Sequence, residues 1–312
     1  MIGELSMRIT LKALQYFLTA VEHESIARAA EQLGVVPSAV SVAIDQVEAE
    51  FSLKLVMRYP SKGIKSTATG QILIGKIRHL LEEYDNLLAE GADLRTALVG
   101  SLRIGYFARI APAFIPDIVA PLSTNNAGVT VKCIECDNET AQDGLLNGDF
   151  DVVLFFAGTV KPGIAVEPLM ELSPHLLVGT DHPLARRKSV RLTELGGHPL
   201  VLLDLPLNNE YYRAILDEAE VEPNVVATAT TTEMIRSLVG AGVGCSILHM
   251  RPLIDTSYAG DRLVAIPIRP KVKSLRLVLG RLEGNPRRLV HAFVEECRQY
   301  FHSPAAEQLA VL

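Results

Sequence analysis

Hydrophobic side chains recur at helical spacing through the first sixty residues. They form two clear runs, Leu11, Leu14, Phe17, Leu18 and Val21, and then Val40, Ile44, Val47 and Phe51. Between the runs, Ser25 is placed to cap a helix and Gly34 can end it in a left-handed conformation. Pro37 suits the first turn of the next helix, where its missing N–H is not needed. Two short helices joined by a tight turn indicate a helix-turn-helix, although a generic three-helix bundle has the same pattern.

A longer amphipathic run follows, nearly thirty residues without proline, from about 68 to 96. Its apolar residues are Ile72, Leu73, Ile77, Leu80, Leu81, Tyr84, Leu87 and Leu88. Such length without caps predicts a linker or coiled-coil helix, and the simplest partner for its stripe is a second copy of the chain. The preceding segment 58–67 is rich in turn residues and locally basic, which suits either a wing along DNA phosphates or a solvated surface loop.

Beyond Gly100 the pattern alternates between strands and helices. Strands are predicted near 102–106, 129–134, 151–156, 176–178, 200–203, 225–227 and 275–279, and helices near 113–123, 140–147, 211–219, 232–241 and 286–301. This alternation predicts an α/β fold with parallel sheets and right-handed crossovers. Two such lobes would form a cleft in which ligands bind at the carboxyl ends of the strands.

Composition changes this picture in two ways. At 312 residues and 48% hydrophobic residues, the chain can form two or three domains with large cores. It has neither a long uncharged apolar stretch nor a signal core, so no membrane contact is predicted and the cytoplasm is the expected location.

The net charge of −6 argues against a generally basic DNA-binding surface, and residues 1–100 alone hold 10 Lys and Arg against 12 Asp and Glu. Phosphate affinity would therefore depend on local placement or on a dimer.

Motifs for catalysis, metals or cofactors are weak. Segment 70–77 approaches a P-loop but has Ile77 in place of Ser or Thr and lies in a helical pattern. The glycines of 240–244 follow a helix and lack dinucleotide-binding spacing. Cys133 and Cys136 have no second cysteine pair, so ordinary thiols are favoured over a redox or metal pair. No nucleophile-elbow or zinc-protease motif occurs, and we expect neither an enzyme nor a cofactor or metal site.

A specific set of residues and spacings marks the first seventy positions: Phe17, Ser25, Ala29, Ala30, Leu33, Ser38, Ala39, Val40, Ser41, Ile44, Glu48, Leu55, Arg58, Thr67 and Gly70. This set resembles the helix-turn-helix region of the LysR-type transcriptional regulators. Segments 147–151, 182–185 and 238–244 are also similar to the family. The resemblance implies a multidomain chain: an all-α winged helix-turn-helix, a linker helix, and an α/β two-lobed domain like a periplasmic binding protein. The implied ranges are 1–67, 68–97 and 98–304, with lobe I at about 98–172 and 273–304 and lobe II at about 173–272. It further implies dimers or tetramers that bind double-stranded DNA under the control of a small-molecule effector.

The implied DNA contacts lie on the second helix of the motif, its flanks and the wing. They are Ser25, Arg28, Pro37, Ser38, Ser41, Val42, Asp45, Gln46, Arg58, Lys62 and Lys65. This sequence departs from the family because no Lys or Arg occurs between Pro37 and Phe51. Hydroxyl and amide groups can still read base edges, but Asp45 would repel phosphates. A solute-binding module whose first helices serve assembly therefore stays open as the alternative function.

The implied effector contacts follow the strands of both lobes. They are Phe107, Ala108, Arg109, Ile110, Asp137, Asn138, Phe156, Asp204, Asn208, Thr230, Thr231 and Thr232. Helix N-termini converge there and favour anions, and Arg109 would pair with a carboxylate, so a small organic acid is the predicted effector. Arg109 on the surface, and Phe107 and Phe156 in the core, are equally ordinary alternatives.

Overall fold

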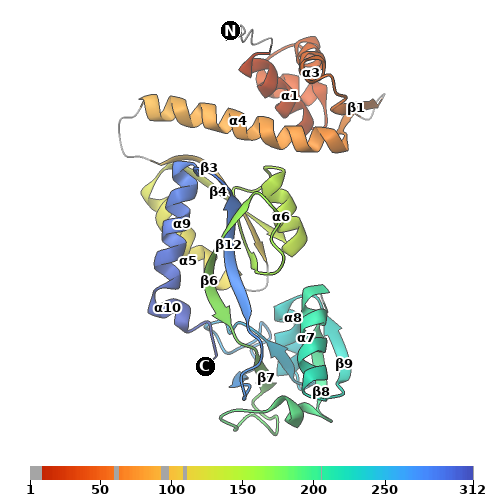
Figure 1. Ribbon diagram of the computed structural model, residues 1–312, viewed down its shortest axis with the longest axis vertical. Helices are drawn as coiled ribbons and strands as arrows, with labels where there is room; N and C mark the ends of the chain where they lie inside the picture. The colour runs from red at the N-terminus through yellow and green to blue at the C-terminus, as the bar shows by residue number, and fades with distance from the viewer. Residues whose placement is uncertain (1–8, 60–62, 93–97, 108–110, 205, 312) are drawn as a thin grey trace.

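A computed structural model describes residues 9–59, 63–92, 98–107, 111–204 and 206–311. The chain begins with a small domain of helices followed by a two-stranded hairpin (Figure 1). Its elements are α1 (Leu11–Glu22), α2 (Ile26–Leu33), α3 (Pro37–Phe51), β1 (Val56–Tyr59) and β2 (Gly63–Ser66). The predicted caps are present, since the Ser25 hydroxyl accepts from the Arg28 backbone N–H and Gly34 ends α2 at φ +64°. The hairpin is the predicted wing.

The buried carboxylate of Glu48 joins α3 to this hairpin. Its Oε1 accepts from the backbone N–H groups of Leu55 and Val56 at 2.8 and 3.1 Å, and Lys54 donates to Oε2 at 2.6 Å. Burial raises the pKa of Glu48, but the Lys54 ammonium and the two N–H donors outweigh burial and hold the pKa below its ordinary value. The Glu48 side chain therefore ties α3 to the start of the hairpin.

Helix α4 (Ala68–Ala92) carries the chain away from this domain. Its first turn is fixed by Thr67, whose hydroxyl accepts from the Gly70 N–H at 2.9 Å and donates to the Lys54 carbonyl at 2.8 Å. Ile74 and Ile77 are buried against the first domain. The remaining apolar stripe is exposed and consists of Ile72, Leu80, Tyr84, Leu87 and Leu88. Within the described part of the chain, this stripe of α4 is therefore left without a partner.

The first lobe of the α/β part is built on a five-stranded sheet with the order β4-β3-β5-β12-β6. The strands are β3 (Val99–Phe107), β4 (Gly128–Cys136), β5 (Val152–Phe156), β6 (Ile164–Leu172) and β12 (Leu275–Leu282). Strand β3 pairs in parallel with β4 and β5, whereas β12 is antiparallel to both β5 and β6. The predicted parallel pairing is therefore confirmed for β3, β4 and β5, but the strand predicted near 275–279, β12, runs antiparallel to its neighbours. The chain returns from the second lobe and enters this sheet from its far end, which reverses β12.

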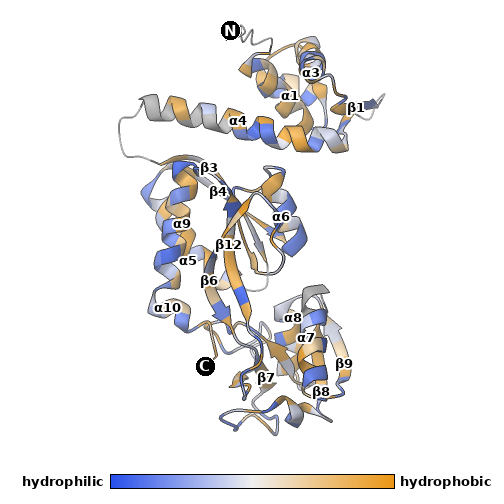
Figure 2. Ribbon diagram, in the orientation of Figure 1, coloured by the Kyte–Doolittle hydropathy of each residue, from blue (hydrophilic) through white to orange (hydrophobic). Residues whose placement is uncertain are grey.

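Helices cover both faces of this sheet, as Figure 1 shows. Helices α5 (Ile115–Asn125) and α9 (Arg288–Phe301) pack on one face, and α6 (Asn138–Leu146) packs on the other. Alternate residues of β5 serve the two cores, because Leu154 faces α5 and α9 while Phe155 faces α6. A strand covered on both sides is apolar throughout, which explains the continuous run that predicted β5. The short helix α10 (Pro304–Glu307) follows α9. Figure 2 shows hydrophobic residues concentrated along the strands and polar residues on the outer helix faces.

The second lobe holds a three-stranded sheet, β10-β7-β11, and a parallel pair, β8-β9. Its elements are β7 (His175–Gly179), β8 (Pro199–Leu203), α7 (Pro206–Glu218), β9 (Asn224–Ala229), α8 (Thr232–Gly240), β10 (Ser246–Leu248) and β11 (Leu263–Pro267). Two 3-10 turns, η1 (Ala111–Ala113) and η2 (Leu192–Leu195), complete the assignment. Strands β6, β10 and β11 are absent from the sequence-based prediction. The burial alternation of β6 is interrupted at Leu169 and Met170, Pro168 lies within that strand, and β10 has three residues, so neither makes a strong periodic signal.

Two segments connect the lobes, one before β7 and one before β12. The hydroxyls of Ser173 and Ser274, one from each segment, lie 3.0 Å apart. From lobe II, the Tyr211 hydroxyl donates to the Lys273 carbonyl. The two connections are therefore tied to each other and to α7.

Candidate nucleic-acid interface and ligand site

The outward face of α3 carries the predicted base-reading residues. Ser38, Val42, Asp45 and Gln46 are exposed and Ser41 is half-buried, while the opposite face of the helix supplies Val40, Ile44 and Val47 to the core. Pro37 occupies the first turn of the helix and is itself exposed. The apolar stripe therefore fixes which polar side chains point outward.

A cation does reach this face, from the hairpin instead of from the helix. The Arg58 guanidinium donates to Ser41 Oγ at 3.0 Å and to Asp45 Oδ1 at 2.7 Å. The sequence predicts that Asp45 repels phosphates, and the structure adds a partner for its charge, because β1 places Arg58 over it. Both side chains are largely exposed, so the pair adds little stability, but it makes this part of the face nearly neutral.

A shallow groove adjoins this face, between the start of α2 and the hairpin. Its volume is about 440 Å³, and Ser25, Arg58 and Tyr59 are among its lining residues. The exposed Arg28 lies in the first turn of α2, and the exposed Lys65 lies on β2. The remaining predicted contact, Lys62, falls outside the described residues. A helix N-terminus beside cationic side chains is suited to hold a backbone phosphate.

In lobe I the predicted effector residues meet at the carboxyl ends of β3, β4 and β5. The rings of Phe107 and Phe156 are buried and pack edge-to-face with centroids 5.3 Å apart. Asn138 brackets the backbone of Phe156, donating to its carbonyl at 2.8 Å and accepting from its N–H at 3.2 Å. Asp137 caps α6 by accepting from the N–H groups of Glu139 and Thr140 at 3.0 and 2.8 Å. A protein carboxylate therefore already occupies this helix N-terminus.

In lobe II the corresponding strand ends carry Asp204 and the threonines 230–232. The Asp204 N–H donates to the Ala229 carbonyl at 2.9 Å, and its carboxylate accepts from Asn209 at 2.8 Å. Thr231 caps α8 by accepting from the Met234 N–H at 3.3 Å. Thr230 and Thr231 are exposed and Thr232 is half-buried. The structure brings these residues to one end of lobe II, whereas Ala108, Arg109, Ile110 and the Asn208 side chain fall outside the described part.

The cysteine pair on β4 has no geometry for joint chemistry. Cys133 and Cys136 are three residues apart on one strand, so their side chains point to opposite faces of the sheet. Burial, with smaller contributions from the carboxylates of Asp137 and Glu135, raises the pKa of Cys136 to about 12, and burial also raises the pKa of Cys133. Both thiols are therefore protonated at neutral pH. Among the described residues, no group of three or more His, Cys, Asp or Glu could hold a metal, and no helix is long and apolar enough to cross a membrane.

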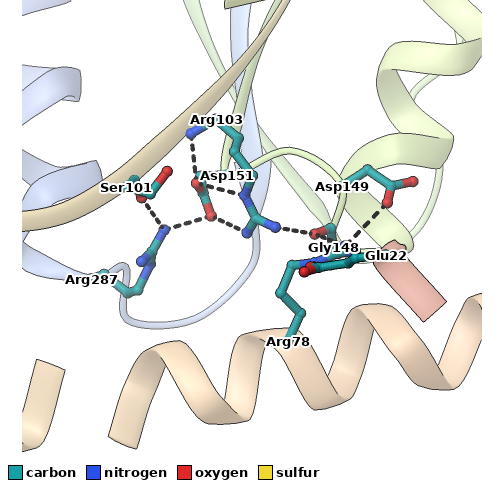
Figure 3. Close-up of polar contacts among 8 residues, drawn as sticks. All are labelled: Glu22, Arg78, Ser101, Arg103, Gly148, Asp149, Asp151 and Arg287. Atoms are coloured by element: carbon teal, nitrogen blue, oxygen red, sulfur yellow. Dashed lines mark hydrogen bonds and ion pairs between the residues drawn. The ribbon is translucent and has the colours of Figure 1, made fainter. Parts of the chain in front are cut away.

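A junction between α4 and lobe I, which the sequence did not predict, joins the two parts of the chain (Figure 3). Arg78 of α4 forms ion pairs with Glu22 of α1 at 3.6 Å and with Asp149 of lobe I at 3.3 Å. It also donates to the Gly148 carbonyl at 3.3 Å, which Arg103 of β3 reaches at 2.9 Å. One side chain thus contacts the first domain and lobe I together.

The junction rests on a buried ionic cluster. The carboxylate of Asp151 pairs with Arg103 at 2.9 Å and with Arg287 at 2.6 Å. The side chains of these three residues are 6–10% exposed. On the helix side, Gly75 lies against the carbonyl of Asn147 so closely that an added Cβ would overlap the oxygen. One signal for this close approach was present in the sequence. Gly75 interrupts an otherwise helical pattern, within the segment 70–77 that approaches a P-loop.

Comparisons with known proteins agree with this architecture. Residues 11–71 match the family model described as bacterial regulatory helix-turn-helix protein, lysR family, and residues 95–302 match that of the LysR substrate binding domain. The chain is 26% identical over 245 residues to the regulator AlsR of Bacillus subtilis strain 168, and this alignment covers 76% of the chain and 80% of AlsR. It is 29% identical over 253 residues to the regulator YnfL of Escherichia coli K12, and this alignment covers 78% of the chain and 82% of YnfL.

Solved structures show the same fold along nearly the whole chain. The PA01 protein of Pseudomonas aeruginosa, described as a LysR family regulator, has a TM-score of 0.62 at 27% identity and covers 95% of this chain and 100% of its own. A full-length OxyR variant from Pseudomonas aeruginosa has a TM-score of 0.73 at 20% identity, and the match covers 93% of this chain and 98% of the OxyR chain. This match shows a shared fold. The predicted multidomain architecture is confirmed.

Proposed function

The chain belongs to the LysR family of transcriptional regulators, which bind DNA through the helix-turn-helix and an effector through the second domain, and we propose that its effector is a small organic acid. We further propose that residues 1–67 read DNA, 68–97 join two subunits and 98–304 sense the effector. A regulator of this kind is expected to work in the cytoplasm, on the chromosome.

The observation that carries the DNA-binding proposal is the outward face of α3. Its exposed Ser38, Val42 and Gln46 are short or neutral side chains that can approach base edges in the major groove. Ser and Gln side chains donate and accept hydrogen bonds there, and the Val42 side chain suits contact with a thymine methyl group. These side chains, together with Pro37, Ser41 and Asp45, are the proposed base-reading set.

Phosphate contacts are proposed for the flanks of this face. Arg28 and Ser25 at the start of α2, and Arg58, Lys62 and Lys65 of the hairpin, would follow the DNA backbone. Because one subunit offers few cations, a dimer that doubles them supports useful affinity. The exposed apolar stripe of α4 supports dimer formation, since it is apolar along several turns and has no partner within the described part of the chain.

The organic-acid proposal is sharpest at α8. Thr231, a neutral cap, leaves the dipole at the start of this helix uncompensated. The acidic residue of its first turn, Glu233, is engaged elsewhere, since its oxygens accept from Arg236 at 3.1 Å and from the Tyr258 N–H at 2.6 Å. By contrast, Asp137 neutralises the start of α6. A carboxylate effector is therefore expected at Thr230, Thr231 and Thr232, with Arg109 as its proposed cation.

A footprinting experiment on the DNA upstream of the chain's own gene tests both proposals. We expect protection at low salt, and a change in its extent when an organic acid that raises the Tm of the protein is added. The variant Thr231→Val should lose the thermal shift and keep the footprint. Absence of any footprint at low salt would favour the assembly module, and an unchanged acid response in Thr231→Val would refute the effector position.

A further inference from the structure

A cavity lies between α4 and lobe I, beside the Arg78 junction. Its volume is about 220 Å³. Three parts of the chain form its wall: α4 through Lys76 and His79, the segment after α6 through Phe150, and the turn from β12 to α9 through Arg281 and Glu283. The site is separate from the strand ends at which the effector residues lie.

The charges around the cavity are unequal. Lys76 and His79 are exposed at its edge, and neither has an ion-pair partner among the residues that the structure describes. The Arg281 guanidinium donates to the carbonyl oxygens of Leu282 and Gly284 at 3.0 and 3.2 Å, which are neutral acceptors. On the acidic side, Glu283 is exposed to solvent. The side chains of Lys76, Arg281 and Glu283 together leave an excess of positive charge.

The floor of the cavity is rigid and partly apolar. Asp151 holds Arg103 and Arg287 in place there, as described above for the junction. Phe150 and Val290 are buried and add apolar wall. The space is smaller than the roughly 300–1,000 Å³ of typical drug-sized ligand sites. A fitting occupant is therefore small, with an anionic end toward the cations and an apolar end toward Phe150.

We propose that this cavity binds a small organic anion, a carboxylate or phosphate group joined to an apolar body. Such a ligand would contact α4 and lobe I at once, and it would add to the contacts that Arg78 makes between them. It would therefore strengthen the attachment of the DNA-binding unit to lobe I without entering the space between the lobes. This second site is independent of the proposed interlobe effector site.

The test uses the full chain with three probes: benzoate, phenyl phosphate and inorganic phosphate. Binding is followed by calorimetry and located by hydrogen exchange. We expect at least one aromatic anion to bind and to slow exchange in residues 76–82 and 281–290. Inorganic phosphate is expected to bind more weakly, because it lacks the apolar body. The double variant Lys76→Ala and Arg281→Ala should bind at least ten-fold more weakly.

The matched control removes a cation elsewhere. Lys188 is exposed in lobe II, so Lys188→Ala should leave the affinity unchanged. The Tm of each unliganded variant shows whether it is folded. The proposal is overturned if no probe binds, if both variants bind like the parent chain, or if protection falls only at 204 and 230–232. The last result would instead place the anion at the interlobe site, and none of these results bears on DNA binding.

Discussion

A methyl group at position 75 should separate α4 from lobe I. The carbonyl of Asn147 occupies the space that a Cβ on Gly75 would need, and lobe I must retreat by about 2 Å to restore van der Waals distance. Arg78 reaches Gly148 and Asp149 at 3.3 Å, so the same retreat takes both acceptors beyond hydrogen-bonding distance. Within the helix itself, Ala is favoured over Gly by about 1 kcal/mol. The substitution Gly75→Ala therefore strengthens α4 and opens the junction.

The size of the effect follows from the two contacts that are lost. The Arg78 side chain is 20% exposed and the Asp149 carboxylate is 57% exposed, so each of the two contacts contributes about 0.5–1 kcal/mol after screening by solvent. A loss of about 1–2 kcal/mol shifts the ratio of closed to open junctions by roughly five- to thirty-fold. We expect faster hydrogen exchange in residues 144–151 by a factor in this range, with exchange in 72–80 unchanged or slower.

The control for this experiment is Gln71→Ala, on the exposed side of the same helix. It changes helix propensity without meeting lobe I, so exchange in 144–151 should match that of the parent chain. In DNA-binding assays, Gly75→Ala should keep its basal affinity and lose most of the effector-induced change. Unchanged exchange in 144–151 would refute the reasoning, because it would mean that the helix does not lie against this loop in solution.

Three further changes test other parts of the structure. The substitution Asp45→Asn should release Arg58 to contact a DNA phosphate. Affinity for all DNA sequences should then rise, and the slope of log K against log salt concentration should steepen by about one. Weaker DNA binding in a filter assay would contradict this prediction. Glu48→Gln should destabilise the first domain by about 1–3 kcal/mol in urea unfolding, because three donors lose a charged acceptor. Because the pKa of Glu48 is lowered in the folded chain, its carboxylate adds to the free energy of unfolding above the ordinary pKa of 4.5, and this contribution is lost as the pH falls through the folded pKa. If the stability of the parent chain and of Glu48→Gln changes in parallel below pH 5, this expectation is contradicted. Asp151→Asn should destabilise lobe I by about 3–5 kcal/mol by leaving two buried guanidinium groups without their carboxylate, and a change under 1 kcal/mol would argue against the buried cluster.

Local features were predictable from the sequence and distant pairings were not. Ser25, Gly34 and Pro37 act within one turn of the residues they cap, so their roles follow from neighbouring positions. The direction of β12 depends on where the chain returns after the whole second lobe, and no local pattern records that. The same holds for β10, whose three residues are specified by pairing with β7.

The candidate sites divide in the same way. The exposed face of α3 follows from the spacing of its buried residues, which is a local signal. The partner of Asp45 does not, because the hairpin register that places Arg58 above it is a tertiary feature. Arg78 and Asp149 are 71 positions apart, and only packing of α4 on lobe I brings them together. The glycine at 75 indicated a close approach but did not identify the partner.

The pairing of Arg58 with Asp45 also affects how such a protein finds its operator. Non-specific binding depends on cations that neutralise phosphates, and a chromosome offers about 10⁶–10⁹ competing sites. A recognition face whose cation is already matched by a carboxylate has less attraction for arbitrary sequence. The base contacts proposed for Ser38 and Gln46 would then make up a larger fraction of the binding energy. If these residues read the operator, the low charge of this face favours discrimination over affinity and shortens the time that each subunit spends on DNA that it does not regulate.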